Sequence, residues 1–194
     1  MKILYYAASI LVFAILIYLL ISQRKKQKPV EAKPVAGDVS ENAANPYMGL
    51  RAQIFALKPS DLNLNLPADN ETAFGVVIEF GTEDGTATVI SLATGDASMY
   101  TSGGGGMIGG AYRDNVKKAA ISFVNTSQRF FTQMRPGNTA LPAIGHIKFH
   151  VLTNKGAYSF EGLEAEITAQ NSEWVDLFDK ANEVITQLRL ISDK

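Results

Sequence analysis

Cysteine is absent from this sequence, histidine occurs only twice and tryptophan only once. Without cysteine the chain has no disulfide, no thiolate zinc site and no cysteine nucleophile, and no lipid anchor is attached through that residue. The absence does not distinguish between compartments, because a cysteine-free domain is stable on either side of a membrane. It does exclude several classes of enzyme and metal site.

An excess of positive charge is also missing from most of the chain. From Ala44 onward the sequence has sixteen Asp and Glu residues against twelve Lys and Arg residues, so this part is mildly acidic. Phosphate contacts with nucleic acid require a basic face. The composition therefore argues against nucleic acid as a partner.

One long hydrophobic run is present, at the start of the chain. Residues 3–21 carry no charge and, as a helix, would extend roughly 28 Å, close to the thickness of a bilayer's hydrocarbon core. A cleaved signal peptide has a shorter apolar region with a small-residue site soon after it, whereas the nearest such site here is residues 30–32. We therefore predict a transmembrane signal anchor over residues 1–22, with the lipid bilayer as the partner of residues 3–21.

Charges around this run predict an orientation. Lys2 and the α-amino group precede the run, and four bases follow it: Arg24, Lys25, Lys26 and Lys28. Cytoplasmic flanks carry the excess of Lys and Arg, so we expect a single-pass membrane protein with a cytoplasmic C-terminal domain. Residues 23–44, basic at first and then rich in Pro and Ala, are expected to be a linker. Residues 45–194 are long enough for one α+β domain.

Hydrophobic periodicity in residues 45–194 predicts three helices and five strands. Helical spacing indicates helices over 46–57, over about 111–134 and from Ser172 toward the C-terminus. Alternating apolar residues between short turns predict strands over 74–80, 86–92, 97–101, 146–152 and 157–160. Residues 62–66 are a further candidate for a short edge strand.

These elements define the predicted fold class. Short turns join only antiparallel neighbours, so the order α-β-β-β-α-β-β-α predicts a five-stranded antiparallel sheet with three helices on one face or on both. Profilin-like, roadblock-like and longin-like domains share this order, although an analogy at that level carries no function. The full prediction is one N-terminal transmembrane helix followed by this α+β domain.

A glycine-rich loop is the most unusual local feature. Six of the nine residues in 102–110 are glycine, and Gly104, Gly106 and Gly109 match the G-x-G-x-x-G pattern of dinucleotide-binding proteins. The pattern lacks its context here, because the preceding strands are expected to be antiparallel and no acidic residue occurs between Asp114 and Glu161. A P-loop is excluded as well, because no Gly-Lys-Ser/Thr follows.

Three interpretations of this loop remain open. It is a connection that allows the next helix to pack closely on the sheet, or a mobile flap with an apolar tip that contacts a partner or the membrane. Alternatively it is an anion nest at the helix N-terminus, with Arg113, Lys117 and Lys118 as further anion contacts. The candidate ligand or partner loop comprises Gly103, Gly104, Gly105, Gly106, Met107, Ile108, Gly109 and Gly110.

Other candidate chemistry is sparse. His146 and His150 lie four residues apart on a predicted strand, about 13 Å from end to end, which is too far for one metal ion. Glu161, Glu164 and Glu166 are expected to form a solvated rim. No combination of residues supplies a nucleophile, a base and oxyanion donors, so the sequence predicts no catalytic residue, metal or cofactor.

One block of the sequence resembles a known pattern. Gly75 through Ala120, with its strands, its glycine loop and the start of the following helix, is similar to a family of uncharacterised bacterial proteins. The resemblance covers about a quarter of the chain and implies a bacterial source, with no activity. Taken together, these features predict a membrane-anchored binding or assembly module with a protein partner or self-association. The alternative is a small-ligand or phosphate-binding domain that uses the glycine loop.

The polar helix faces and alternating strands lead to a first testable expectation. A fragment of residues 44–194 is expected to be soluble and to unfold cooperatively without detergent, because its apolar residues can be buried within the domain. Circular dichroism during urea titration measures this. Aggregation, or a transition without cooperativity, would show that residues 1–43 contribute to the core.

Overall fold

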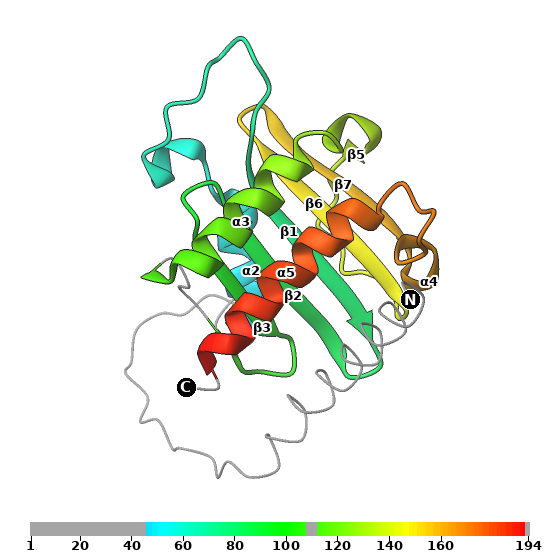
Figure 1. The fold of residues 1–194 in the computed structure, drawn as a ribbon. Coiled ribbons are helices and arrows are strands. Elements are labelled where there is room, and N and C mark those ends of the chain that lie inside the picture. The colour runs from blue at the N-terminus through cyan, green and yellow to red at the C-terminus, as the bar shows by residue number, and fades with distance from the viewer. Residues whose placement is uncertain (1–45, 108–111, 193–194) are drawn as a thin grey trace, which may run out of the picture. The chain divides into compact units, whose positions relative to one another are not determined.

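The computed structural model describes residues 46–107 and 112–192, which form a three-layer α+β fold (Figure 1). The α-helices of this part are α2 (Pro46–Ala56), α3 (Asp114–Ser127), α4 (Glu164–Ile167) and α5 (Val175–Ser192), with 3-10 turns η3 (Pro59–Leu62) and η5 (Phe131–Gln133). The strands are β1 (Ala73–Thr82), β2 (Gly85–Leu92), β3 (Ala97–Thr101), β4 (Gly106–Met107), β5 (Arg135–Pro136), β6 (His146–Thr153) and β7 (Gly156–Leu163).

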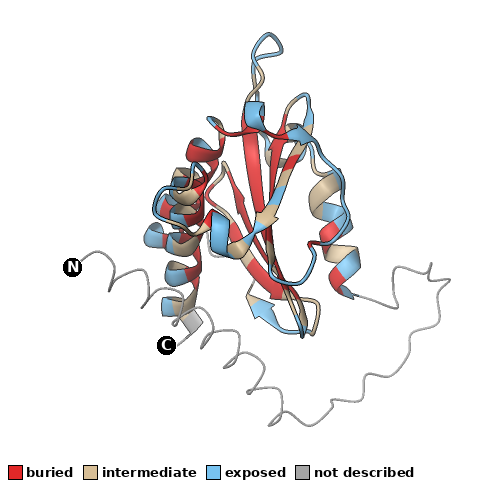
Figure 2. Ribbon diagram, turned by 90° about the vertical axis from the view of Figure 1, so that its right-hand side faces the viewer, coloured by how far each residue is buried: buried red, intermediate tan, exposed pale blue. Residues whose placement is uncertain are grey.

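All seven strands belong to one antiparallel sheet with the order β4-β3-β2-β1-β6-β7-β5. The chain crosses from one edge to the other between β4 and β5, and α3 makes this crossing. Helices α3 and α5 lie side by side over one face of the sheet, and α2 lies over the other (Figures 1 and 2). The middle strand, β1, is buried on both faces over residues 73–81, as its position in the central layer requires.

The face toward α3 and α5 holds an aromatic and aliphatic core. Alternation along β1 places Phe74, Val76, Ile78 and Phe80 on this face. The ring of Trp174, just before α5, stacks on Phe160 of β7 with centroids 3.8 Å apart. The opposite face, under α2, combines Val77, Ile90 and Tyr100 of the strands with Tyr47 of the helix.

The structure corrects the predicted fold class. The described residues form seven strands and four α-helices, where the sequence predicted five strands and three helices. The extra strands β4 and β5 have two residues each and α4 has four, too short to show periodicity. Residues 62–66 are not a strand, and the helix predicted over 111–134 spans only Asp114–Ser127 before the chain turns into η5. The predicted meander and second hairpin are present.

The membrane prediction is corrected as well. Among residues 46–107 and 112–192, no helix is long and apolar enough to cross a bilayer. The predicted anchor over residues 1–22 lies outside the described residues, and the part of the chain that the structure describes contains no membrane span. The single-pass localisation, the cytoplasmic orientation and the transmembrane part of the fold class are therefore withdrawn.

Residues 137–145, here called the strap, follow β5 and lie against the same face of the sheet as α2. The strap approaches β1 most closely at Gly81, where an added Cβ would be 2.0 Å from the carbonyl oxygen of Ala143. The amide of Gly145 donates to the carbonyl of Gly81 at 2.9 Å, which holds the strap in this position. Glycine is required here because the strap and the strand meet backbone to backbone.

A substitution at this contact tests the position of the strap. Gly81→Ala is expected to lower the free energy of unfolding by about 1–3 kcal/mol and to speed exchange of the Gly145 amide, because the strap must move away. Gly75→Ala is the matched control in the same strand. Its added Cβ would meet only side-chain ends, 3.1 Å from Leu92 and 3.2 Å from Leu152. Equal losses in urea unfolding for the two variants would contradict a tight contact at Gly81.

Candidate functional site

Polar side chains form a straight row across five strands on the face under α2. The register pairs Tyr100 with Thr88, Thr88 with Glu79, Glu79 with Lys148, and Lys148 with Glu161. Directly opposed residues share a face, so all five point toward α2 and the strap. Glu79, Thr88 and Lys148 are fully buried, so each needs a partner within the fold.

Helix α2 supplies the partner of Glu79. The guanidinium of Arg51 donates to both carboxylate oxygens, from Nε at 2.7 Å and from Nη2 at 2.8 Å. The two side chains are 4% and 0% exposed, which makes this a buried, bidentate ion pair. His150 contacts Oε2 of the same carboxylate through Nε2 at 3.1 Å, and Thr88 donates to Oε1 at 3.3 Å.

The same guanidinium also reaches the strap. Nη1 of Arg51 donates to the carbonyl of Thr139, and Nη2 lies 3.4 Å from the carbonyl of Ala140. Arg51 therefore connects α2, the central strand and the strap through one planar group. Its guanidinium also lies over the ring of Phe55, one turn further along α2, at 4.8 Å from the centroid.

These contacts shift the pKa values of the buried groups. Burial raises the pKa of Glu79, but the hydrogen bonds from Arg51 and His150 outweigh it and hold that pKa at about 2. Burial lowers the pKa of His150, so the imidazole is neutral in the folded protein even though Glu79 opposes this shift. Burial raises the pKa of Tyr100, whose hydroxyl makes no hydrogen bond within the described part of the chain.

Lys148 lies beside this cluster and is held by the strap. Its Nζ donates to Oδ1 of Asn138 at 2.7 Å and to the carbonyl of Ala140 at 2.9 Å, and lies 3.3 Å from a carboxylate oxygen of Glu161. The other oxygen of Glu161 accepts from the amide of Ala143. The second charged pair of the row thus attaches the strap, as the first attaches α2.

The two histidines occupy different environments. His150 is 1% exposed and packs edge-on against Phe55 with ring centroids 4.7 Å apart, whereas Nδ1 of His146 contacts the carbonyl of Ile144 near the surface. Among the described residues, no three His, Cys, Asp or Glu side chains are arranged to hold a metal ion. Apart from Tyr100, the row is a network of hydrogen bonds and ion pairs that holds α2 and the strap.

The described part of the glycine loop forms a tight turn between β3 and β4. Gly104 and Gly105 have φ angles of 91° and 85°, and a Cβ on Gly106 would be 2.5 Å from the carbonyl oxygen of Met99. Glycine is thus required by the turn and by the close pairing of β4 with β3. Met107 is half-buried against Met99 in this pair. Ile108, Gly109 and Gly110 lie outside the described residues, so a contact role for the loop stays a prediction.

The three basic residues predicted as anion contacts do not converge. Arg113 is exposed and stacks on Tyr112 at 5.2 Å, beside a depression of about 330 Å³ between the start of α3 and the end of α5. Lys117 is exposed, and its aliphatic stem packs against Gly95. A Cβ added to Gly95 would lie 2.3 Å from Cγ of Lys117. Lys118 alone lines the groove between α3 and α5.

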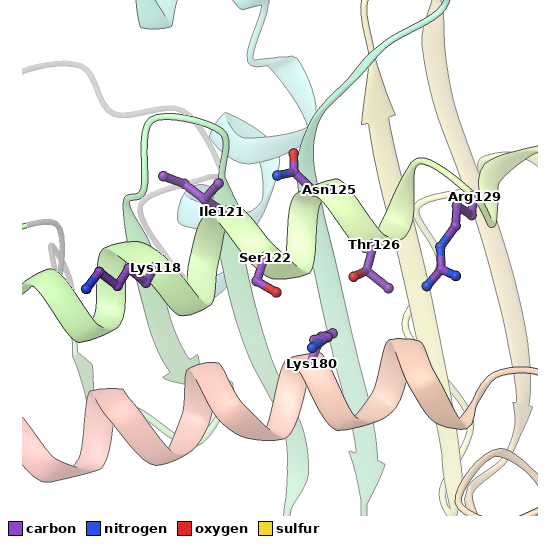
Figure 3. A pocket seen from close by; sticks show the side chains of 7 residues that line it. All are labelled: Lys118, Ile121, Ser122, Asn125, Thr126, Arg129 and Lys180. Atoms are coloured by element: carbon purple, nitrogen blue, oxygen red, sulfur yellow. The ribbon is translucent and has the colours of Figure 1, made fainter.

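That groove has a volume of about 530 Å³ and runs along the outer side of the two helices (Figure 3). Figure 3 shows the hydroxyls of Ser122 and Thr126 directed toward α5, where Lys180 lies opposite them. Arg129, at the end of the groove, forms an ion pair with Asp176 in which both side chains are more than half exposed. The residues that line the groove are Lys118, Ile121, Ser122, Asn125, Thr126, Arg129 and Lys180.

Sequence analysis missed most of these residues. Glu79 interrupts an apolar strand, and Lys148 and His150 interrupt another, which was a usable signal because charged residues are seldom found within such apolar strands unless they are paired. Their partner, Arg51, is 28 positions from Glu79 and gave no signal. Comparison with protein-family models, with curated proteins and with solved structures finds no match, so the site is interpreted from its own geometry.

The buried carboxylate predicts how stability depends on pH. Because the pKa of Glu79 is lowered from 4.5 to about 2, its contribution of about 3 kcal/mol is complete above pH 4.5 and is lost as the pH falls toward 2. About 2 kcal/mol is gone by pH 3. Burial lowers the pKa of His150 from its ordinary value of 6.5, so His150 adds a loss of stability in the same direction as the pH falls below 6.5.

Glu79→Gln tests this assignment. At pH 7 it is expected to cost about 3–5 kcal/mol in urea unfolding, because Arg51 is left buried without its counter-charge. The difference from the wild type narrows at pH 3, since the variant has no carboxylate to protonate at this position. Glu83→Gln, at the exposed turn between β1 and β2, makes the same change of charge and serves as control. If Glu79→Gln lowered the free energy of unfolding by the same amount at pH 7 and at pH 3, the proposed contribution of the Glu79 carboxylate to stability would be refuted.

Proposed function

We propose that this domain is a binding module that takes an acidic segment of a protein partner in the groove between α3 and α5. The observation that carries the proposal is the gathering of three cations, Lys118, Arg129 and Lys180, along one groove of a domain with excess acid. Surfaces that concentrate one sign of charge attract and orient ligands of the opposite sign.

The charge of the groove is available to a ligand. Lys118 is exposed, and neither Lys118 nor Lys180 forms an ion pair with another described residue. Burial and the charge of Asp176 raise the pKa of Asp179, and the nearby charge of Lys180 opposes this shift, so Asp179 balances part of the charge of Lys180. The pair of Arg129 and Asp176 is solvated, and such exposed pairs contribute little, so a ligand carboxylate can replace Asp176 at small cost.

The shape of the groove supports a polypeptide over a small molecule. Lys118 lies in α3 and Arg129 lies just beyond its end, eleven residues later, which corresponds to roughly 15 Å at the rise of a helix. No single phosphate therefore reaches all three cations. Sites for small ligands are enclosed and mostly apolar, whereas Ile121 is the single aliphatic residue of this lining. Hydroxyl and amide groups of Ser122, Thr126 and Asn125 add donors suited to carboxylates and backbone carbonyls.

A model peptide tests the proposal on the full-length chain. A fluorescent decaglutamate peptide is expected to bind the wild-type chain at low salt. The double variant Lys118→Glu/Lys180→Glu is expected to bind it at least about tenfold more weakly, because two attractions become repulsions. Anisotropy titration gives the dissociation constants. Lys155→Glu, at the exposed β6–β7 turn, is the control with unchanged binding.

Two results would contradict the groove as the binding site. Equal weakening in the Lys155→Glu variant would mean that binding follows total charge and needs no particular surface. The second result is that decaglutamate does not bind, whereas inorganic tripolyphosphate binds and loses at least about tenfold in affinity in the double variant. This result would favour the small-anion alternative.

A further inference from the structure

The acceptors around the Arg51 guanidinium form a complete set that lies outside α2. The two oxygens of Glu79 belong to β1, and the carbonyls of Thr139 and Ala140 belong to the strap. We infer that these groups are a guanidinium-recognition site. Arg51 occupies it within the chain, and an arginine side chain on a helix of a protein partner occupies it in place of α2.

The site stays oriented without α2, because other residues hold the carboxylate. His150 contacts Oε2 of Glu79 at 3.1 Å, and Thr88 donates to Oε1 at 3.3 Å. The strap carbonyls are fixed by Lys148, whose Nζ donates to Ala140, and by the Gly145–Gly81 hydrogen bond. Departure of α2 removes the guanidinium, the Phe55 ring and the Tyr47 hydroxyl, which lies 2.9 Å from Oγ1 of Thr88, and leaves the acceptors on β1 and the strap.

The geometry selects a guanidinium over an ammonium group. Nε and Nη2 of Arg51 donate in parallel to the two oxygens of Glu79, and Nη1 donates away from them to the strap. Only a planar fork with donors on two sides satisfies both directions at once, whereas a lysine ammonium is a compact point charge on a flexible stem. A buried carboxylate with this arrangement is therefore specific for arginine.

Helix α2 docks on the sheet through one side, as a helical ligand would. Tyr47 belongs to the apolar cluster of this face, and Leu50 and Ile54 are partly buried against it. The helix has 11 residues, of which only Tyr47 and Arg51 are buried. Isolated helices of this length are marginal in water, so α2 depends on docking for its structure. Residues 57–72 join it to β1 with one 3-10 turn and no strand or α-helix, so the helix is attached through a connection without regular structure over most of its length. Its contact residues Tyr47, Arg51 and Phe55 lie four apart, a pattern that any partner helix can present.

Chemical rescue tests this inference on the full-length chain. Arg51→Ala removes the atoms of an N-ethylguanidinium ion and is expected to lower Tm by roughly 6–20 °C, because Glu79 is left buried and unpaired. Millimolar N-ethylguanidinium is expected to raise the Tm of this variant by at least about 3 °C, because it binds only the folded form. N-Ethylammonium at the same concentration and ionic strength is expected to have no such effect.

Arg129→Ala is the matched control. It also removes a guanidinium from an arginine–aspartate pair, but that pair is solvated, so no built site remains for the additive. If Arg51→Ala is unfolded alone, the same additives are compared for recovery of a cooperative transition. Rescue by ammonium as strong as rescue by guanidinium, rescue of Arg129→Ala, or no rescue of Arg51→Ala would each overturn the inference.

A peptide tests the role of a partner helix. A labelled peptide with the sequence of residues 46–56 is expected to bind the Arg51→Ala chain at least about tenfold more tightly than the same peptide with lysine in place of arginine. The wild-type chain is expected to bind it more weakly, since its own α2 fills the site. Equal binding of the two peptides to the variant would refute recognition of a partner's arginine. None of these results depends on the groove between α3 and α5, because those two helices lie on the face of the sheet opposite α2 (Figure 2).

Discussion

The bidentate pair of Arg51 and Glu79 determines how the second face of the sheet is covered. Both charges are buried, and moving an ion out of water costs several kcal/mol even after relaxation. The guanidinium offsets this cost because it donates to two carboxylate oxygens and to the strap at the same time. Removing either charge leaves the other uncompensated, which is a larger penalty than the pair's own net contribution. The positions of α2, β1 and the strap are therefore coupled through one planar group.

The two faces of the sheet are organised by different forces. Under α3 and α5 the contact is apolar, with Trp174 stacked on Phe160, and such burial is non-directional. Under α2 an apolar cluster around Tyr47 adjoins a polar and directional row, in which every partner of Glu79 and Lys148 must have hydrogen-bond geometry. The apolar face leaves the outer sides of its helices free for the groove, whereas the polar face encloses its charged groups. The proposed acidic ligand and the proposed partner arginine therefore bind on opposite sides of the sheet and carry opposite charges.

Only part of the candidate site could be predicted from the sequence. Alternation along the strands places Glu79, Lys148 and His150 on the face opposite the large apolar side chains, since side-chain direction in a strand has period two, but it does not indicate that this face is covered. The sequence did not indicate that they share one row, because that depends on the register between β1 and β6, which are separated by more than sixty residues. The high glycine content of the loop has a local explanation in its described part, where the glycines allow a tight turn and the close pairing of two strands. Lys118 was predicted as an anion contact, but its neighbours Arg129 and Lys180 come together only when α3 and α5 pack.

The sequence by itself determined the α+β class, the longer helices and strands and the antiparallel hairpins, because periodicity and short turns are local properties. It did not determine β4, β5 or α4, which are too short to carry a period and exist through pairing and packing with distant segments. The long apolar run at residues 3–21 suggested a span that the described structure does not show. Tertiary structure alone decided the seven-strand order, the side of the sheet that α2 covers and the partner of each buried charge. These depend on contacts between residues far apart in the chain, whose geometry no local pattern encodes.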